Sequence, residues 1–221
     1  NLYMASYLND SQGRVKLDTN ITNPSEEGAK PAEVLEKPKQ EPLPDYSKLM
    51  AQLSKELVFD IPAKAMFHLM FGEKSPVFKY TENGTIIRSN IETTPWRLVH
   101  THMVEREISF NTSDSNTKTL FTDSDDRITY LQRIERMDNN WCYVVFQRHA
   151  VVKLPQGDSF YTTHRFVITK LTKSSCTLSI WSNIEWIKSS IFKNVTEPMI
   201  MNKLTLDANA VLRECVVARE K

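Results

Sequence analysis

Apolar and polar residues alternate through most of the second half of the chain, with the period of two that is typical of half-buried β-strands. Short polar connections separate the alternating segments, so neighbouring strands are predicted to pair antiparallel. Within the segment 97–111 the alternation predicts Val104, Arg106 and Ile108 on one face and Phe110 on the other. The predicted strands cover residues 85–88, 97–111, 127–136, 141–153, 160–171 and 176–187.

A short stretch before these strands changes its hydrophobic period twice. Residues 57–61 alternate as a short strand would, Pro62 ends that strand, and from Ala63 the apolar residues recur at helical spacing. Gly72 is predicted to end the helix in the left-handed conformation, which glycine adopts at low cost. Before the strand, Asp45 is expected to cap another short amphipathic helix.

The loop after the helix that ends at Gly72 has charged residues followed by two apolar ones. An apolar loop tip beside a helix is typical of a lid over a cavity or of a segment that probes a membrane. The other interpretation is that Val77 and Phe78 simply begin the next strand. The candidate lid consists of Gly72, Glu73, Lys74, Ser75, Pro76, Val77 and Phe78.

The C-terminal stretch has the three- and four-residue spacing of an amphipathic helix. Thr196 is expected to cap it, with Pro198 in the first turn, where the missing amide proton costs nothing. A long helix of this kind covers the apolar side of an antiparallel sheet. The pattern therefore predicts an α+β fold of the helix-grip type, in which a curved antiparallel sheet grips a long C-terminal helix. The apolar face of that helix contains Ile200, Leu204, Ala208, Val211, Leu212 and Cys215.

Composition divides the 221 residues into three parts. Residues 1–22 carry a small apolar cluster and a turn, and we interpret them as the possible tail of a preceding module. Residues 23–44 hold five prolines and eight charged residues with almost nothing apolar, which predicts a linker. Residues 45–221 then form one domain, because their length and apolar content can build one good-sized core.

The sequence shows no set of residues with the spacing of a catalytic or metal-binding site. His100 and His102 share one strand face without a third ligand, so hydrogen-bonded or exposed histidines are the better interpretation. The net charge of +1 gives no general attraction for nucleic acid. Three cysteines without paired spacing indicate free thiols in a reducing compartment. We therefore expect no enzyme activity, no metal and no cofactor.

Four segments, in order, resemble the VASt domain, a relative of the StAR-related lipid transfer domain that occurs in fungal Lam proteins and animal Aster proteins. They are FDIPAKAMFHLMFG, TPW with the following EREISF strand, LPQGD with the DSFYTTHRFVITKL strand, and the terminal amphipathic helix. The resemblance covers residues 53–220. It implies that one sterol, such as ergosterol or cholesterol, is held between the sheet and the long helix, with the loop 72–78 as a gate.

A sterol has one hydroxyl and a large apolar surface, so a cavity that holds it must be mainly apolar. The small side chains of Ser182 and Ala208 favour open space between sheet and helix. For any single candidate the competing interpretation is an ordinary core residue. The candidate cavity residues are Trp96, Tyr143, Val145, Phe166, Ile168, Ile180, Ser182, Ile184, Trp186, Leu204, Ala208 and Val211.

The resemblance also implies where the domain works. It predicts sterol transfer at contact sites between the endoplasmic reticulum and the plasma membrane, on the cytosolic face, by a protein that is membrane-anchored at full length. The present fragment is expected to be soluble and monomeric. Basic residues outnumber acidic ones between residues 165 and 203, which predicts contact with an anionic membrane surface through Lys170, Lys173, Lys188 and Lys193.

The alternative function is a contact-site adaptor whose filled core binds protein or membrane without carrying lipid. The size of the cavity separates the two functions, because a lipid needs roughly several hundred Å³ and an adaptor needs none.

Overall fold

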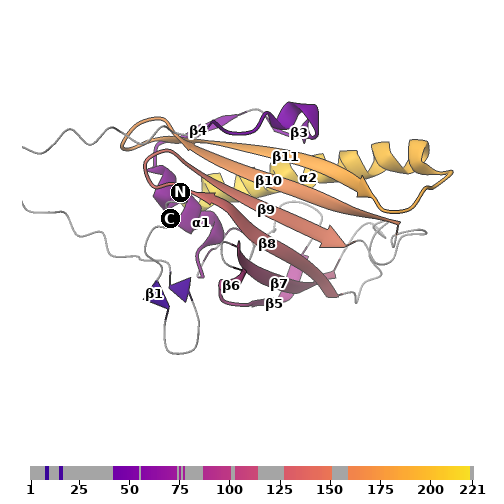
Figure 1. Ribbon diagram of the computed structural model, residues 1–221, viewed down its shortest axis with the longest axis horizontal. Coiled ribbons are helices and arrows are strands. Elements are labelled where there is room, and N and C mark those ends of the chain that lie inside the picture. The colour runs from indigo at the N-terminus through magenta and orange to yellow at the C-terminus, as the bar shows by residue number, and fades with distance from the viewer. Residues whose placement is uncertain are drawn as a thin grey trace, which may run out of the picture.

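The computed structural model describes residues 8–9, 15–16, 42–54, 56–73, 75, 77, 87–100, 103–113, 127–150 and 159–219. Nine strands among them form one curved antiparallel sheet, and the long helix α2 (Lys193–Arg219) runs along one face of it (Figure 1). The predicted α+β helix-grip fold is therefore confirmed. The sheet order is β3 (Ala51–Gln52), β11 (Cys176–Trp186), β10 (Phe160–Lys170), β9 (Cys142–Ala150), β8 (Arg127–Met137), β7 (Met103–Ser113) and β5 (Ile87–Thr93), with β4 (Leu57–Phe59) also on β11 and β6 (Arg97–His100) also on β7.

The prediction of one strand over residues 97–111 is wrong. Two strands, β6 and β7, pair with each other in this region, and Leu98 lies opposite Val104. Phe110 is buried on the same face as Val104 and Arg106, because residues two apart along β7 point to the same side. Arg106 is thus a core position on the inner face of the sheet, the face that α2 covers. His102 lies outside the described residues, and His100 is exposed.

Helix α1 (Ala63–Phe71) begins after Pro62, as predicted, and buries Met66, Phe67, Met70 and Phe71. The ring of Phe67 stacks on Tyr143 of β9 with 4.9 Å between centroids. This anchors α1 to the inner face near the C-terminal half of α2, where both helices join one apolar cluster.

Gly72 follows α1, but the predicted left-handed cap is wrong. Its φ is −63° and its ψ is 160°, which is extended backbone, while its N–H donates to the carbonyl of His68. A Cβ at this position would lie 2.5 Å from that carbonyl oxygen. Close approach of the backbone, and not a positive φ, is therefore the reason for glycine here.

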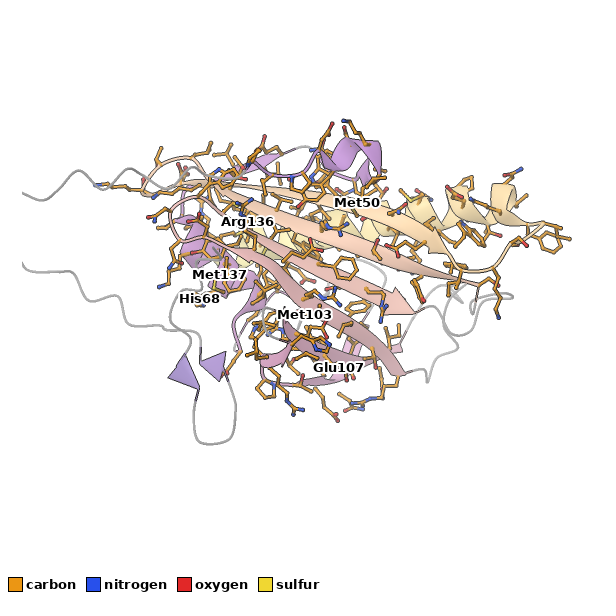
Figure 2. The ribbon with its side chains drawn as sticks, viewed as in Figure 1. Met50, His68, Met103, Glu107, Arg136 and Met137 are labelled. Atoms are coloured by element: carbon orange, nitrogen blue, oxygen red, sulfur yellow. The ribbon has the colours of Figure 1, made fainter. Side chains whose placement is uncertain are left out.

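The helix predicted after Asp45 is only one 3-10 turn, η1 (Tyr46–Lys48). Asp45 does cap it, since its carboxylate accepts from the N–H of Ser47 at 3.2 Å. The chain then pairs with the sheet as β3, which ends the helical geometry. Met50, just before β3, lies over the outer face of the sheet, and its sulfur is 3.1 Å from a guanidinium nitrogen of Arg165 (Figure 2).

Helix α2 begins at Lys193, three residues before the predicted cap at Thr196, so Pro198 lies inside the helix and not in its first turn. The reason is a turn that the sequence pattern did not reveal. The N–H groups of Val195 and Thr196 both donate to the carbonyl of Phe192, which starts the helical bonding early.

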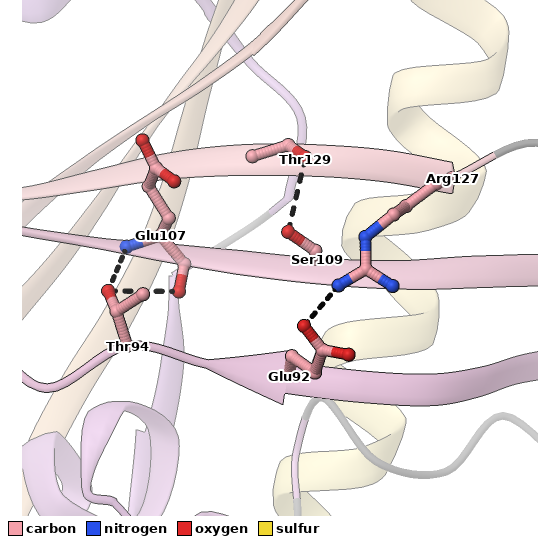
Figure 3. Close-up of polar contacts among 6 residues, drawn as sticks. All are labelled: Glu92, Thr94, Glu107, Ser109, Arg127 and Thr129. Carbon is pink, nitrogen blue, oxygen red and sulfur yellow. Dashed lines mark hydrogen bonds and ion pairs between the residues drawn. The ribbon is translucent and has the colours of Figure 1, made fainter.

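The outer face of the sheet is mostly polar on β5, β7 and β8. Arg127 pairs with Glu92, Ser109 bonds Thr129, and the hydroxyl of Thr94, just after β5, accepts from the N–H of Glu107 at 2.8 Å (Figure 3). The buried apolar side chains of β7 and β8 face inward, in the cluster that α1 and α2 join. Near the N-terminus, the short strands β1 (Leu8–Asn9) and β2 (Val15–Lys16) pair as a hairpin. The domain boundaries at residues 22 and 44 stay predictions.

Candidate functional site

Five polar residues lie directly opposite one another across five neighbouring strands, and together we call them the polar row. Each is a register partner of the next, from β7 through β8, β9 and β10 to β11. All five are buried, although their neighbours on the inner face are mostly apolar. The polar row consists of Arg106, Gln132, Gln147, His164 and Ser182.

Hydrogen bonds join the first three residues of the polar row to one another, and they join its last two residues. Arg106 Nε donates to Gln132 Oε1 at 2.8 Å, and Gln132 Nε2 donates to Gln147 Oε1 at 2.7 Å. The Arg106 guanidinium lies over the ring of Trp96, 4.4 Å from its centroid. Burial lowers the pKa of Arg106 to about 9, and the nearby charge of Glu73, in the candidate lid, partly offsets this shift. Arg106 thus stays a buried cation at neutral pH.

At the other end of the row, His164 Nδ1 shares a hydrogen bond with Ser182 Oγ. Burial lowers the pKa of His164 to about 4, because the charged imidazolium would lose its hydration in the interior. The imidazole is therefore neutral at pH 7. A neutral imidazole has one donor and one acceptor nitrogen, so the nitrogen that does not face Ser182 is available for another hydrogen bond.

A small cavity of ≈ 20 Å³ lies between the polar row and α2. Its polar lining comes from Gln147 and His164 on the sheet and from Asp207 on the helix. This volume is enough for a water molecule and far too small for a lipid. The remaining lining residues are Tyr130, Phe166, Ile180, Ala208 and Val211.

Of the twelve predicted cavity residues, the structure brings Phe166, Ile180, Ala208 and Val211 together around this cavity. Ser182 lies behind His164 as its hydrogen-bond partner. The other seven pack in two apolar clusters. Trp96, Tyr143, Val145 and Ile168 belong to the cluster beneath α1, and Ile184, Trp186 and Leu204 belong to a cluster near the start of α2.

Sequence reasoning missed Tyr130, Gln132, Gln147 and Asp207. A signal for two of them was present, because Gln132 and Gln147 occupy positions where the alternation calls for an inward apolar residue. That the two glutamines meet each other depends on strand register, which the alternation does not define.

The VASt family, whose full description is VAD1 Analog of StAR-related lipid transfer domain, matches residues 53–203. The chain belongs to the VASt family. Comparison with curated protein sequences gives no match.

Several solved structures are similar to this VASt domain at low sequence identity. Human STARD10 is 12% identical with a TM-score of 0.41, over 75% of this chain and 64% of that one. Norcoclaurine synthase from Thalictrum flavum, solved with dopamine and hydroxybenzaldehyde, is 13% identical with a TM-score of 0.41, over 78% and 89%. The ZhuI aromatase/cyclase from Streptomyces sp. R1128 is 10% identical with a TM-score of 0.40, over 75% and 93%.

The candidate lid of this VASt domain is fastened to α1 in the described conformation. Ser75 Oγ donates to the carbonyl of Leu69 at 2.6 Å and accepts from the N–H of Val77 at 3.2 Å. Val77 is fully buried in the cluster beneath α1, and it lies in a turn and not in a strand. Lys74, Pro76 and Phe78 lie outside the described residues.

The four predicted membrane-facing lysines lie at two opposite ends of the sheet. Lys170 ends β10 and Lys173 lies in the following turn, whereas Lys188 and Lys193 come after the far end of β11. The 11 residues of β11 separate the two pairs, a span of about 35 Å in an extended strand. The four lysines therefore cannot form one patch.

The three cysteines are free and buried. Burial raises the pKa of Cys142 and of Cys176 to about 11, so their thiols stay protonated and unreactive at neutral pH. In the part of the chain that the structure describes, no group of His, Cys, Asp and Glu residues could hold a metal ion. No described helix is long and apolar enough to cross a membrane.

Proposed function

We propose that this VASt domain binds one sterol between α2 and the inner face of the sheet and transfers it between membranes. The observation that carries the proposal is the polar row, which places Gln147 and His164 in an otherwise apolar interior beside a cavity. Family membership supports lipid binding or transfer in general. The choice of a sterol rests on the chemistry of the cavity lining.

The cavity lining favours a ligand with a hydroxyl over one with a phosphate. Gln147 and His164 can each donate to or accept from a hydroxyl. The only charged residue of the lining is Asp207, which is acidic and would repel a phosphate. Arg106 carries the nearest cation of the polar row, but Gln132 lies between it and Gln147.

A second polar group supports a ligand in the same region. Thr162 lies two residues before His164 on the same face of β10, and its buried hydroxyl has no hydrogen-bond partner among the described residues. A buried hydroxyl without a partner is costly, so a ligand or a water molecule that satisfies it stabilises the domain.

This cavity can hold a sterol only if the domain opens, because ≈ 20 Å³ is too small for one. Only six of the 27 residues of α2 are buried, in one narrow stripe, so the helix can shift with a modest loss of contact. We assign the gate to residues 72–78, whose attachment to α1 through Ser75 must be released. Ligand uptake then replaces the lost apolar contacts.

The small volume of this cavity, which the described residues line, favours a second candidate function. A helix-grip core that is filled by its own side chains suits an adaptor that binds protein or membrane and carries no lipid. The cellular setting is common to both functions. We propose the cytosolic face of the endoplasmic reticulum at contact sites with the plasma membrane, with an anionic membrane surface as partner.

Equilibrium titration of the purified chain with a fluorescent sterol separates the two functions. A transfer domain should bind sterol in a saturable way with one molecule per chain, and cholesterol or ergosterol should compete while phosphatidylserine should not. Absence of saturable binding by a chain that melts cooperatively would contradict the sterol proposal and favour the adaptor. Competition by phosphatidylserine alone would contradict the choice of a hydroxyl ligand.

A further inference from the structure

Helix α2 has a second apolar face on the side opposite its buried stripe. Val195, Met199 and Leu206 are exposed, and their spacing of four and seven residues places them on one line along the helix. Ile191 and Phe192, in the connection directly before α2, are exposed as well. Ile191 is 89% exposed and Val195 is 67% exposed.

The exposed face of α2 has no negative charge. All 27 residues of the helix are described, and its exposed charged residues are Lys193, Arg213 and Arg219. Its acidic residues Glu197, Asp207 and Glu214 are all half-buried. Glu197 accepts from Trp186 Nε1 at 3.2 Å, Asp207 lines the cavity, and both carboxylate oxygens of Glu214 are buried. At about 100° per residue, none of the three acidic residues lies on the line of Val195, Met199 and Leu206.

Two of the basic residues have acidic neighbours, but these pairs are weak. Lys193 lies 4.0 Å from Glu197, and Arg219 lies 3.6 Å from Asp60, and each of these side chains is at least 39% exposed. Exposed pairs of this kind contribute little and are screened by salt. The basic side chains can therefore turn toward another anionic surface at small cost.

We infer that the outer face of α2 lies flat on an anionic phospholipid bilayer. Aliphatic side chains along one line of a helix, flanked by basic residues and free of acidic ones, are the pattern of helices that bury one face in the headgroup region. At 1.5 Å per residue the helix offers a contact about 40 Å long. The first turns of α2 extend past the sheet in Figure 1, so the sheet does not obstruct the contact.

This docking surface adds to the proposed function and does not depend on the ligand. Because α2 also forms one wall of the cavity, a membrane that holds α2 would lie next to the ligand site. This surface is mainly apolar, and it differs from the membrane contact through four lysines that the sequence predicted. Of those lysines, only Lys193 lies on α2, and its Nζ is 5.8 Å from the centroid of the Trp186 ring.

Cosedimentation with sterol-free vesicles tests the surface apart from the ligand. The purified chain should bind vesicles of phosphatidylcholine with phosphatidylserine and should bind phosphatidylcholine alone much more weakly. The double variant Val195→Asn with Leu206→Asn should weaken binding at least about tenfold, and Arg213→Glu should weaken it about fivefold or more. Matched controls are Val58→Asn on β4 and Arg148→Glu on β9, which remove an exposed apolar and an exposed basic residue from the outer face of the sheet.

Loss of binding in the α2 variants, with normal binding in the controls, would support the docking surface. Equal binding of all variants, or no binding of the unmodified chain to anionic vesicles, would overturn it. Self-association through α2 in place of vesicle binding would overturn it as well. Fluorescent sterol titration of the same variants in solution should be normal, so failure of the docking surface and failure of the sterol proposal give different results.

Discussion

The charge of His164 is decided by burial and not by a neighbouring charge. Because burial lowers its pKa from 6.5 to about 4, the folded domain does not take up the proton that the unfolded chain binds below pH 6.5. The free energy of unfolding should therefore fall by about 3 kcal/mol in total as the pH decreases from 6.5 to 4. Above pH 6.5 the neutral His164 should cause no such loss.

Urea denaturation at several pH values measures this loss of unfolding free energy. His164→Gln is the matched control, because it keeps a hydrogen-bonding group opposite Ser182 but has no titrating proton. The variant should lose most of the dependence between pH 6.5 and 4, while the carboxylates titrate as before. The same pH dependence in both proteins would show that His164 is not buried as described.

Gln132 should be the most sensitive uncharged member of the polar row. It accepts from Arg106 and donates to Gln147, so Gln132→Leu removes the hydrogen-bond partner of a buried cation and that of a buried amide. We expect a loss of about 2 to 4 kcal/mol in unfolding free energy. Ser109→Ala is the control, because its hydrogen bond to Thr129 joins the same two strands on the exposed outer face. It should change stability by less than about 0.5 kcal/mol, and an equal effect of the two variants would contradict the described register.

At the level of elements, substitution of Ala208 on α2 tests whether the cavity binds a ligand or is an ordinary gap in packing. Ala208→Val adds two methyl groups that face the cavity, so it should keep stability or raise it by up to about 1 kcal/mol while it weakens sterol binding. Ala210→Val, on the same helix but outside the lining, should leave binding unchanged. Thermal melting and sterol titration of both variants measure the two effects. Normal sterol binding by a stable Ala208→Val variant would mean that the ligand site lies elsewhere.

The elements were predictable where one periodic pattern ran without interruption. Strands β8, β10 and β11 agree with the predicted ranges within a residue, because inward and outward residues alternate cleanly along each. Predictions failed where a backbone turn decided the outcome. The early start of α2, the division of 97–111 into β6 and β7, and the extended backbone at Gly72 all depend on local hydrogen bonds that the pattern of apolar residues does not contain.

At the scale of the whole molecule, the helix-grip fold could be predicted and most of the site could not. Phe166, Ile180, Ala208 and Val211 were identified because they are inward residues of elements that must face each other. The polar row escaped prediction since it exists only when five strands are in register. Cavity volume is likewise a property of three-dimensional packing, and no pattern of residues along the chain defines it.

The central claim is that the domain opens to take up a sterol, and lipid extraction tests it most directly. The purified chain is incubated with vesicles that contain cholesterol or ergosterol, separated from them by gel filtration, and analysed for bound lipid by mass spectrometry. We expect one sterol per chain for the unmodified protein and little sterol for Ala208→Val. A folded chain that leaves the vesicles without lipid, or that carries a phospholipid in place of a sterol, would contradict it.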